Sequence, residues 1–269
     1  MEIISVGSSS SGNSYIIKAA GRAIILDTGL TCKAIMAALE TESIAPADVA
    51  AVLVTHEHTD HVKSVRAVSR KCGNAVFYAS RGTIASAAVF SYVDEERLTR
   101  VSAGESFAIQ NADDITVTAF PLSHDAAEPL GYTVEADGEK LAVITDTGII
   151  EDTMYEAISD ADMLVFEANH DVDMLMFGEY PYPLKRRIKG DRGHLSNDYA
   201  ADVLSHILED RSEYKTKPLR IMLAHLSTNN NMPLFARQTV EDRLGKDGFR
   251  PGEDYILEVA MKEGLTYMP

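Results

Sequence analysis

Four side chains able to bind a metal ion lie within residues 56–61, which read HEHTDH and directly follow an apolar, strand-like run. On an extended or tightly turned backbone, side chains two residues apart point the same way, so His56 and His58 can chelate one ion. Asp60 and His61 come after the turn and can face a second ion. Imidazole and carboxylate suit zinc, manganese or iron, and a site without thiolates is more typical of catalysis than of a structural role. A surface loop with histidines is the alternative, but this spacing after a strand rarely arises by chance.

Three further candidates for metal ligands also stand where strand-like runs end. His124 follows the run 115–119, Asp146 closes the run 140–145, and His225 comes directly after residues 220–224. Any one of them alone would more often be a buried structural residue. Because all three are expected at the same sheet edge as residues 56–61, the sequence predicts a dinuclear metal site there.

Strand-like and helical patterns alternate along the whole chain without a low-complexity linker, which predicts one continuous domain over residues 1–269. The predicted strands are residues 2–6, 14–18, 23–26, 50–54, 75–79, 115–119, 131–136, 140–145, 162–166, 220–224 and 255–259. The predicted helices are residues 31–41, 61–72, 82–91, 149–159, 197–209 and 233–243.

The tripeptide Asp-Thr-Gly occurs twice, at residues 27–29 and 146–148, each time after a β run and before a helix. This repeat predicts two related halves in an α/β fold, with two mixed sheets packed face to face and helices outside, an αβ/βα sandwich of four layers. A single Rossmann-like layer is the alternative, but the chain has no glycine-rich dinucleotide loop.

Composition limits the class of protein. No apolar run approaches the ~18 residues of a membrane span, and residues 1–6 resemble a first strand more than a signal peptide. Cys32 and Cys72 are far apart, so a reduced, cytoplasmic compartment is expected. The net charge of −16 argues against non-specific adhesion to nucleic acid or membrane, but not against a nucleic-acid substrate, because local basic patches matter more than the sum.

The order of these motifs is similar to the five-motif pattern of the metallo-β-lactamase fold superfamily, and the likeness spans nearly the whole chain. The resemblance implies one metal site made of His56, His58 and His124, and a second made of Asp60, His61 and His225. It implies that Asp146 bridges the two ions and that Asp27 orients a ligand imidazole.

Two further stretches, taken together with the residues that begin at His225, narrow the resemblance. Residues 167–171, 193–197 and 225–227 are similar to motifs of the tRNA 3′-processing ribonucleases (RNase Z), in which a histidine matching His194 protonates the leaving oxygen. His170 stands where that family has an aromatic residue, and the long tRNA-gripping insertion has no counterpart.

With the serine-rich residues 8–14, the pattern most resembles the YycJ/WalJ group of bacterial proteins. That resemblance implies a 5′→3′ exonuclease acting on DNA, linked in some bacteria to mismatch repair and so to DNA-repair proteins.

Several residues are candidates for contact with a nucleic-acid phosphate. The serine-rich segment can offer hydroxyl and N–H donors, although a flexible polar hairpin is an equally good interpretation. A basic run precedes His194 and consists of Lys185, Arg186, Arg187, Lys189 and Arg192. This basic run is expected to lie on a loop at the catalytic edge, although such a run is usually a solvated face. His170 is either a phosphate contact, a further ligand or a surface residue. The candidates are Ser9, Ser10, Asn13, His170, Lys185, Arg186 and Arg187.

The sequence therefore predicts a dinuclear metal-dependent phosphodiesterase acting on DNA or RNA, with two zinc, manganese or iron ions ~3.5–4 Å apart. Asp146 would bridge the ions, Asp60 would orient the nucleophile, and His194 would donate a proton to the departing oxygen. An acyl hydrolase for thioesters or lactones is the first alternative, and it would need neither the basic run nor His194. A metal-stabilised regulatory module without turnover is the second.

Overall fold

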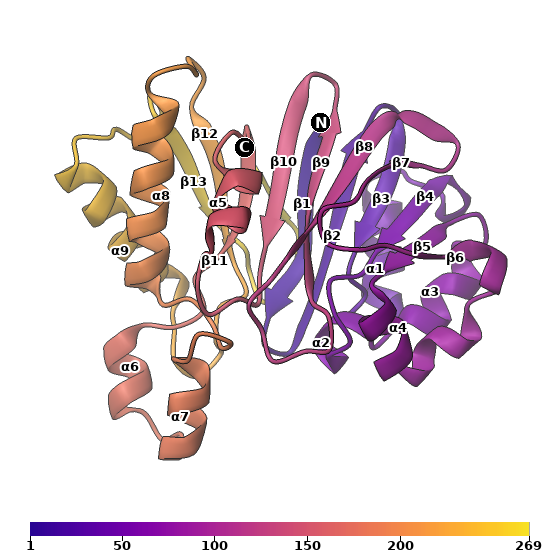
Figure 1. Ribbon diagram of the computed structural model, residues 1–269, viewed down its shortest axis with the longest axis horizontal. Coiled ribbons are helices and arrows are strands. Elements are labelled where there is room, and N and C mark those ends of the chain that lie inside the picture. The colour runs from indigo at the N-terminus through magenta and orange to yellow at the C-terminus, as the bar shows by residue number, and fades with distance from the viewer. Residues whose placement is uncertain (269) are drawn as a thin grey trace.

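Two seven-stranded mixed sheets form the centre of the computed structural model, which describes residues 1–268 (Figure 1). The first sheet has the order β14-β1-β2-β3-β4-β5-β6. Its strands are β1 (Glu2–Ser9), β2 (Gly12–Ala19), β3 (Arg22–Leu26), β4 (Val49–Leu53), β5 (Val76–Ala79), β6 (Leu98–Arg100) and β14 (Thr266–Tyr267).

The second sheet has the order β13-β12-β11-β10-β9-β8-β7. Its strands are β7 (Ser106–Ile109), β8 (Ala112–Pro121), β9 (Leu130–Ala136), β10 (Glu139–Ile144), β11 (Met163–Glu167), β12 (Leu219–Ala224) and β13 (Tyr255–Val259). The parallel strands β4, β11 and β12 are almost continuous apolar runs, as expected for strands that are covered on both faces.

The two sheets repeat one pattern of pairing. In the first sheet, β14, β1, β2 and β3 pair antiparallel, and β3, β4, β5 and β6 pair parallel. In the second sheet, β7 to β10 pair antiparallel and β10 to β13 pair parallel. The two Asp-Thr-Gly tripeptides follow β3 and β10, the fourth strand of each succession, so the sequence repeat corresponds to a structural one.

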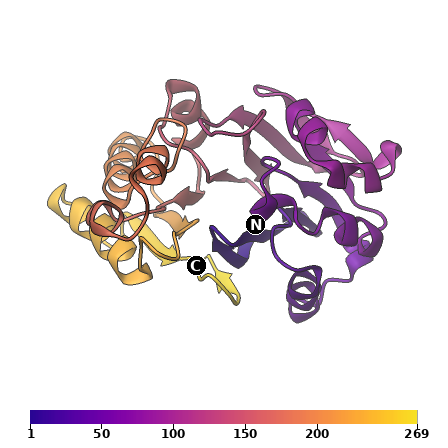
Figure 2. The same ribbon diagram turned by 90° about the horizontal axis from the view of Figure 1, so that it is seen from below.

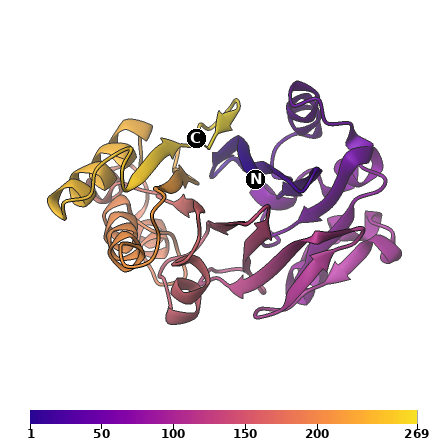
Figure 3. The same cartoon turned by 90° about the horizontal axis from the view of Figure 1, so that it is seen from above.

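Helices cover the outer faces of both sheets, as the views in Figures 2 and 3 show. Helices α1 (Cys32–Thr41), α2 (Thr59–Val62), α3 (Val65–Lys71) and α4 (Arg81–Ser86) and the 3₁₀ turns Pro46–Asp48, Ala88–Tyr92 and Glu95–Arg97 belong to the first half. Helices α5 (Asp152–Ile158), α6 (Val172–Phe177), α7 (Tyr182–Ile188), α8 (Asn197–Arg211) and α9 (Pro233–Lys246) belong to the second.

Three buried apolar clusters hold these layers together. The central cluster joins the facing sides of the two sheets, for example Leu53 of the first sheet and Tyr132 and Val165 of the second. The other two pack the outer face of each sheet against helices such as α1 and α8. The predicted αβ/βα sandwich is therefore confirmed.

Most predicted elements are present, with a few differences. All eleven predicted strands occur, while the short β6, β7 and β14 were not predicted. The predicted helix 61–72 is divided into α2 and α3. The basic run, expected on a loop, lies largely in helix α7. Pro181 and Pro183 suggested a stiff loop, but proline is compatible with the first turn of a helix, where an N–H has no intrahelical partner.

No helix within residues 1–268 is long and apolar enough to cross a lipid bilayer.

Candidate metal centre

The ends of five strands from both sheets meet at one edge of the sandwich, and polar residues follow each of them. In the first sheet, β3 leads into Asp27 and β4 into residues 55–61. In the second sheet, β10 leads into Asp146, β11 ends at Glu167 and β12 leads into His225. This is the edge at which α/β sheets generally place their sites.

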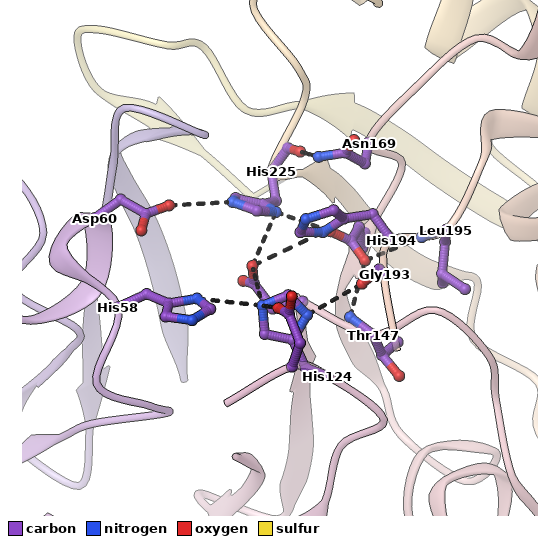
Figure 4. Close-up of polar contacts among 12 residues, drawn as sticks. His58, Asp60, His124, Thr147, Asn169, Gly193, His194, Leu195 and His225 are labelled. Carbon is purple, nitrogen blue, oxygen red and sulfur yellow. Dashed lines mark hydrogen bonds and ion pairs between the residues drawn. The ribbon is translucent and has the colours of Figure 1, made fainter. Parts of the chain in front are cut away.

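His56, His58 and His124 form one group of potential ligands. One nitrogen of each imidazole lies within 4.8 Å of the others. The Nε2 atom of His124 is 3.3 Å from Nδ1 of His58, and Nδ1 of His124 contacts the carbonyl oxygen of Gly193 at 3.1 Å (Figure 4). The structure thus brings His124 together with two histidines that lie more than 60 positions earlier in the chain.

Asp60, His61 and His225 form a second group with the same limit of 4.8 Å. The Asp60 carboxylate lies 3.7 Å from Nε2 of both imidazoles. Asp146 lies between the two groups, with its oxygens 3.2 Å from Nε2 of His61 and 3.8 Å from Nε2 of His124. All seven predicted ligands are therefore in one cluster, in the two sets that the sequence predicts.

Three atoms in this cluster are buried without a hydrogen-bond partner. They are Nε2 of His56, Oδ2 of Asp146 and Nε2 of His225. Unpaired buried polar atoms are rare in folded proteins because desolvation is costly. Nitrogen and oxygen donors that converge in this way fit divalent cations such as zinc or manganese.

The buried charges shift several pKa values strongly. Burial favours the neutral form of His61 and His225, but Asp146 and neighbouring carboxylates outweigh it. They raise the pKa of His61 well above its usual range and that of His225 to about 10. The same ion pairs hold the pKa of Asp146 well below its usual range in spite of burial. A divalent cation would occupy the position that these protons hold in its absence.

Asp27 positions the first half of the cluster. Its carboxylate accepts hydrogen bonds from Nδ1 of His61 at 2.8 Å and from the backbone N–H and hydroxyl of Thr55 at 2.9 Å. Asp27 has a φ of 57° and Asp146 one of 62°, so both aspartates have the strained left-handed backbone that often occurs at functional sites. The predicted contact by which Asp27 orients a ligand imidazole is therefore present, with His61 as the imidazole.

Glu167 has the corresponding role in the second half, which was not predicted. Its Oε1 atom accepts from Nδ1 of His194 and of His225, both at 2.8 Å. Its Oε2 atom accepts from the backbone N–H groups of Thr147 and Leu195. Burial alone would raise the pKa of Glu167, but the two imidazoles lower it to about 2. The one available signal was its position as an acid at the end of a strand.

Asp146, Glu167, His194 and His225 also lie close enough to form a metal-binding group. However, one oxygen of Glu167 already accepts from Nδ1 of both imidazoles. We therefore interpret this set as a hydrogen-bonded network that orients the histidines.

His194 lies beside the cluster with its side chain 15% exposed. Its ring centre is 5.1 Å from that of His124 and 5.2 Å from that of His225. Because Nδ1 faces Glu167, Nε2 is the nitrogen left to act on a substrate.

The predicted serine-rich segment is a tight hairpin whose polar groups mostly point inward. Ser9 and Asn13 are buried at the ends of β1 and β2, and Ser10 is exposed in the turn. The Asn13 side chain bonds the backbone of Ser9 and lies 3.2 Å from Nε2 of His61. The Ser8 hydroxyl accepts from the backbone N–H of His225 at 2.8 Å. The hairpin thus contacts both halves of the cluster.

His170 is buried, and its Nδ1 atom has no partner within residues 1–268. Burial lowers its pKa to about 4, so it is neutral near pH 7. It therefore offers a phosphate no positive charge.

The basic run is divided between structural and free side chains. The Lys185 ammonium donates to the carbonyl oxygens of Met176 and Gly178. Arg187 makes two bonds to Asp125, which follows His124. Hydrogen bonding to Asp125 raises the pKa of Arg187. Arg186 is exposed.

Comparisons with known proteins agree with this geometry. Residues 22–212 match the family model described as the beta-lactamase superfamily domain. The chain is 36% identical over 252 residues to exodeoxyribonuclease YycJ of Bacillus anthracis, covering 94% of this chain and 92% of that protein. It is 33% identical over 250 residues to exodeoxyribonuclease WalJ of Streptococcus pneumoniae, covering 93% and 90%.

The chain belongs to the β-lactamase superfamily and, within it, to the YycJ/WalJ family. Its fold is that of the metallo-β-lactamase fold protein YhfI from Bacillus subtilis, with a TM-score of 0.72 at 12% identity over 98% of each chain. The family resemblance seen in the sequence is thus confirmed.

Proposed function

We propose that this protein is a metal-dependent hydrolase of DNA, an exodeoxyribonuclease as its relatives are named, and that it degrades DNA in the 5′→3′ direction. The observation that carries the proposal is the convergence of three buried donor atoms that make no hydrogen bond, from His56, Asp146 and His225, within a cluster of histidines and aspartates. A protein that only bound nucleic acid would gain nothing from leaving these polar atoms without partners.

Two divalent ions are proposed, one held by His56, His58 and His124 and the other by Asp60, His61 and His225, with Asp146 shared between them. When bound, such ions would supply two things: positive charge that neutralises the phosphodiester, and a water activated as a nucleophile at neutral pH. Zinc, manganese and iron all suit this set of donors.

The remaining roles belong to side chains of the chain itself. Asp60, whose side chain is 25% exposed, lies at the open side of the cluster, where it can orient the attacking nucleophile. Glu167 holds Nδ1 of His194 as a donor and stabilises the ring when it is protonated. His194 can then deliver a proton from Nε2 to the departing oxygen.

Substrate contacts are proposed from position. Arg186 is an exposed cation of the basic run, and Arg187 can exchange Asp125 for a phosphate oxygen at the rim of the metal centre. Ser10 is one of two exposed serines of the hairpin, so a phosphate can reach it. The single domain over residues 1–269, the cytoplasmic location, RNA as a further substrate, and a role with DNA-repair proteins remain predictions from the sequence.

In the test, the protein is first reconstituted with zinc, manganese or iron, and the metal content of the protein is determined. The reconstituted protein is then incubated with end-labelled duplex DNA and with end-labelled single-stranded DNA. We expect stepwise release of nucleotides from the 5′ end and two ions per chain. Efficient turnover of a thioester or lactone, without DNA cleavage under any of these metals, would instead identify an acyl hydrolase.

A further inference from the structure

The segment between β11 and His194 contains a small lobe, formed by α6 and α7, that stands out from the sandwich near the metal centre (Figure 1). Its base is fixed to the centre by several bonds. Arg187 pairs with Asp125, the Arg192 guanidinium donates to the carbonyl oxygens of His124 and Ala126, and Gly193 accepts from His124. These contacts place the lobe beside the groups proposed to act on the substrate.

Helix α7 has one buried face and one free face. Leu184 and Ile188, four residues apart, share one face; Ile188 is buried and Leu184 is half-buried. Tyr182, Arg186 and Lys189 follow one another at i, i+4 and i+7, so they share another face, and all three are exposed. The side chains of Arg186 and Lys189 make no hydrogen bond or ion pair with any residue between 1 and 268.

Two aromatic rings are exposed on this lobe. Phe177 at the end of α6 is 87% exposed and Tyr182 at the start of α7 is 70% exposed. Lys185 bonds the carbonyl oxygens on either side of Phe177, so it ties the end of α6 to the first turn of α7. The two rings are thus held on neighbouring segments, and leaving both in water is unfavourable unless something covers them.

The charge of helix α7 indicates what covers them. Residues 182–190 carry four cations and no acid, whereas the α6 half of the lobe carries Asp173 and Glu179, in a chain with a net charge of −16. A partner with apolar surface alone would leave these cations unpaired. A polyanion with flat unpaired rings satisfies both features, because exposed aromatic rings beside cations stack bases while the cations contact phosphates. Bases within a duplex are already stacked and cannot cover the rings.

We propose that this lobe face, made of Phe177, Tyr182, Arg186 and Lys189, binds an unpaired DNA strand next to the metal centre. This inference rests on the proposed nuclease function and makes it more specific: the substrate is single-stranded, at least at the end that enters the site. The bases stack on the two rings, and the backbone contacts the two cations.

The test compares single-stranded and blunt duplex DNA of the same sequence, with phosphorothioate linkages that resist hydrolysis, by fluorescence anisotropy on the metal-loaded protein. We expect the double substitution Phe177→Ala and Tyr182→Ala to weaken binding of the single strand by about 25-fold or more. Duplex binding should change by less than about twofold. The conservative Tyr182→Trp should retain the affinity of the wild type for the single strand.

Matched controls are Tyr214→Ala, which removes another exposed ring (54%), and Lys217→Ala, both beyond the far end of α8. These should leave binding unchanged. Turnover of bis-p-nitrophenyl phosphate should be the same in all variants, because the lobe face does not touch the reacting atoms.

Unchanged binding of the single strand by the double variant, or an equal loss on duplex, would overturn the proposal. So would a wild-type dimer that the substitutions convert to a monomer, because the face would then be covered by a second copy. Failure of the nuclease function is a separate result: the wild type would cleave no DNA under any metal, whatever the variants bind.

Discussion

Replacing Glu167 by glutamine provides a sharp test of how the centre is organised. The buried carboxylate accepts four hydrogen bonds, two from imidazoles and two from backbone N–H groups. Glutamine keeps the shape but has one oxygen and one NH₂ group. It can therefore satisfy either His194 and His225 or Thr147 and Leu195, and its NH₂ group must face the other two donors.

The expected loss follows from these contacts. Two buried donors without acceptors cost about 2–6 kcal/mol. The pKa of Glu167 gives a consistent figure. Lowering this pKa from 4.5 to about 2 corresponds to about 3 kcal/mol in favour of the ionised carboxylate in the folded protein. If the NH₂ group faces the imidazoles, His225 must change tautomer and direct an N–H toward the metal position. Metal affinity should then fall 10–100-fold.

Three measurements on Glu167→Gln check this reasoning. Denaturant unfolding of the metal-free protein gives the loss of stability, metal titration gives the affinity, and kcat on DNA gives the effect on His194. The stabilisation by Glu167 is fully present above pH 4.5 and is lost as the pH falls through about 2, so the variant should lose this part of the acid dependence.

A matched control is available in Glu57→Gln. Glu57 stands between two predicted ligands, but its carboxylate accepts the backbone N–H of Ala127 at 2.7 Å, and the amide oxygen of glutamine can do the same. This variant should remain close to the wild type. Wild-type metal affinity and stability in Glu167→Gln would refute the assigned role, as would equal losses in both variants.

Four further predictions concern the centre. Asp146→Ala should lose both ions and all turnover, and two ions per chain by elemental analysis would contradict the bridging role. His194→Ala should lower kcat on DNA by ~10²–10⁴-fold with unchanged metal content, and less on a p-nitrophenyl ester whose leaving group needs no proton; equal losses would argue for a structural histidine. In Gly29→Ala, the added Cβ would lie 1.5 Å from the carbonyl oxygen of Asp60, so metal affinity should fall, and an unchanged affinity would reject this packing argument. Because the pKa of His225 is about 10, its ion pairs stabilise the metal-free protein fully below pH 6.5, and this stabilisation is lost as the pH rises through 10. A metal ion must displace the proton that His225 carries near pH 7, so calorimetry in buffers of different ionisation enthalpy should record proton release.

The parallel strands other than the short β6 were predictable because each contains an almost continuous apolar run, as in 50–54 and 220–224. The two-residue β14 and the partly exposed β7 have no such pattern, since their pairing depends on strands far away in the chain. Helices α6 and α7 have six and seven residues, too short for a helical period to be recognised.

The seven clustered side chains were predictable because each stands at the end of a recognisable strand. The role of Glu167 was not, because its imidazole partners are 27 and 58 residues away. The inward orientation of Asn13 was hidden for the same reason, since its contact with His61 spans 48 residues. Local spacing thus predicted which residues gather, while the hydrogen bonds between them depend on the tertiary fold.

The hairpin at the end of β1 has a consequence for the order in which the protein folds. Ser8 bonds the backbone of His225, 217 residues later, and its own N–H donates to the carbonyl oxygen of Met261. Contacts so distant in sequence close only after most of the chain is in place, and they slow folding. The residues of the HEHTDH segment are therefore synthesised early but wait for the last part of the chain before their surroundings are complete.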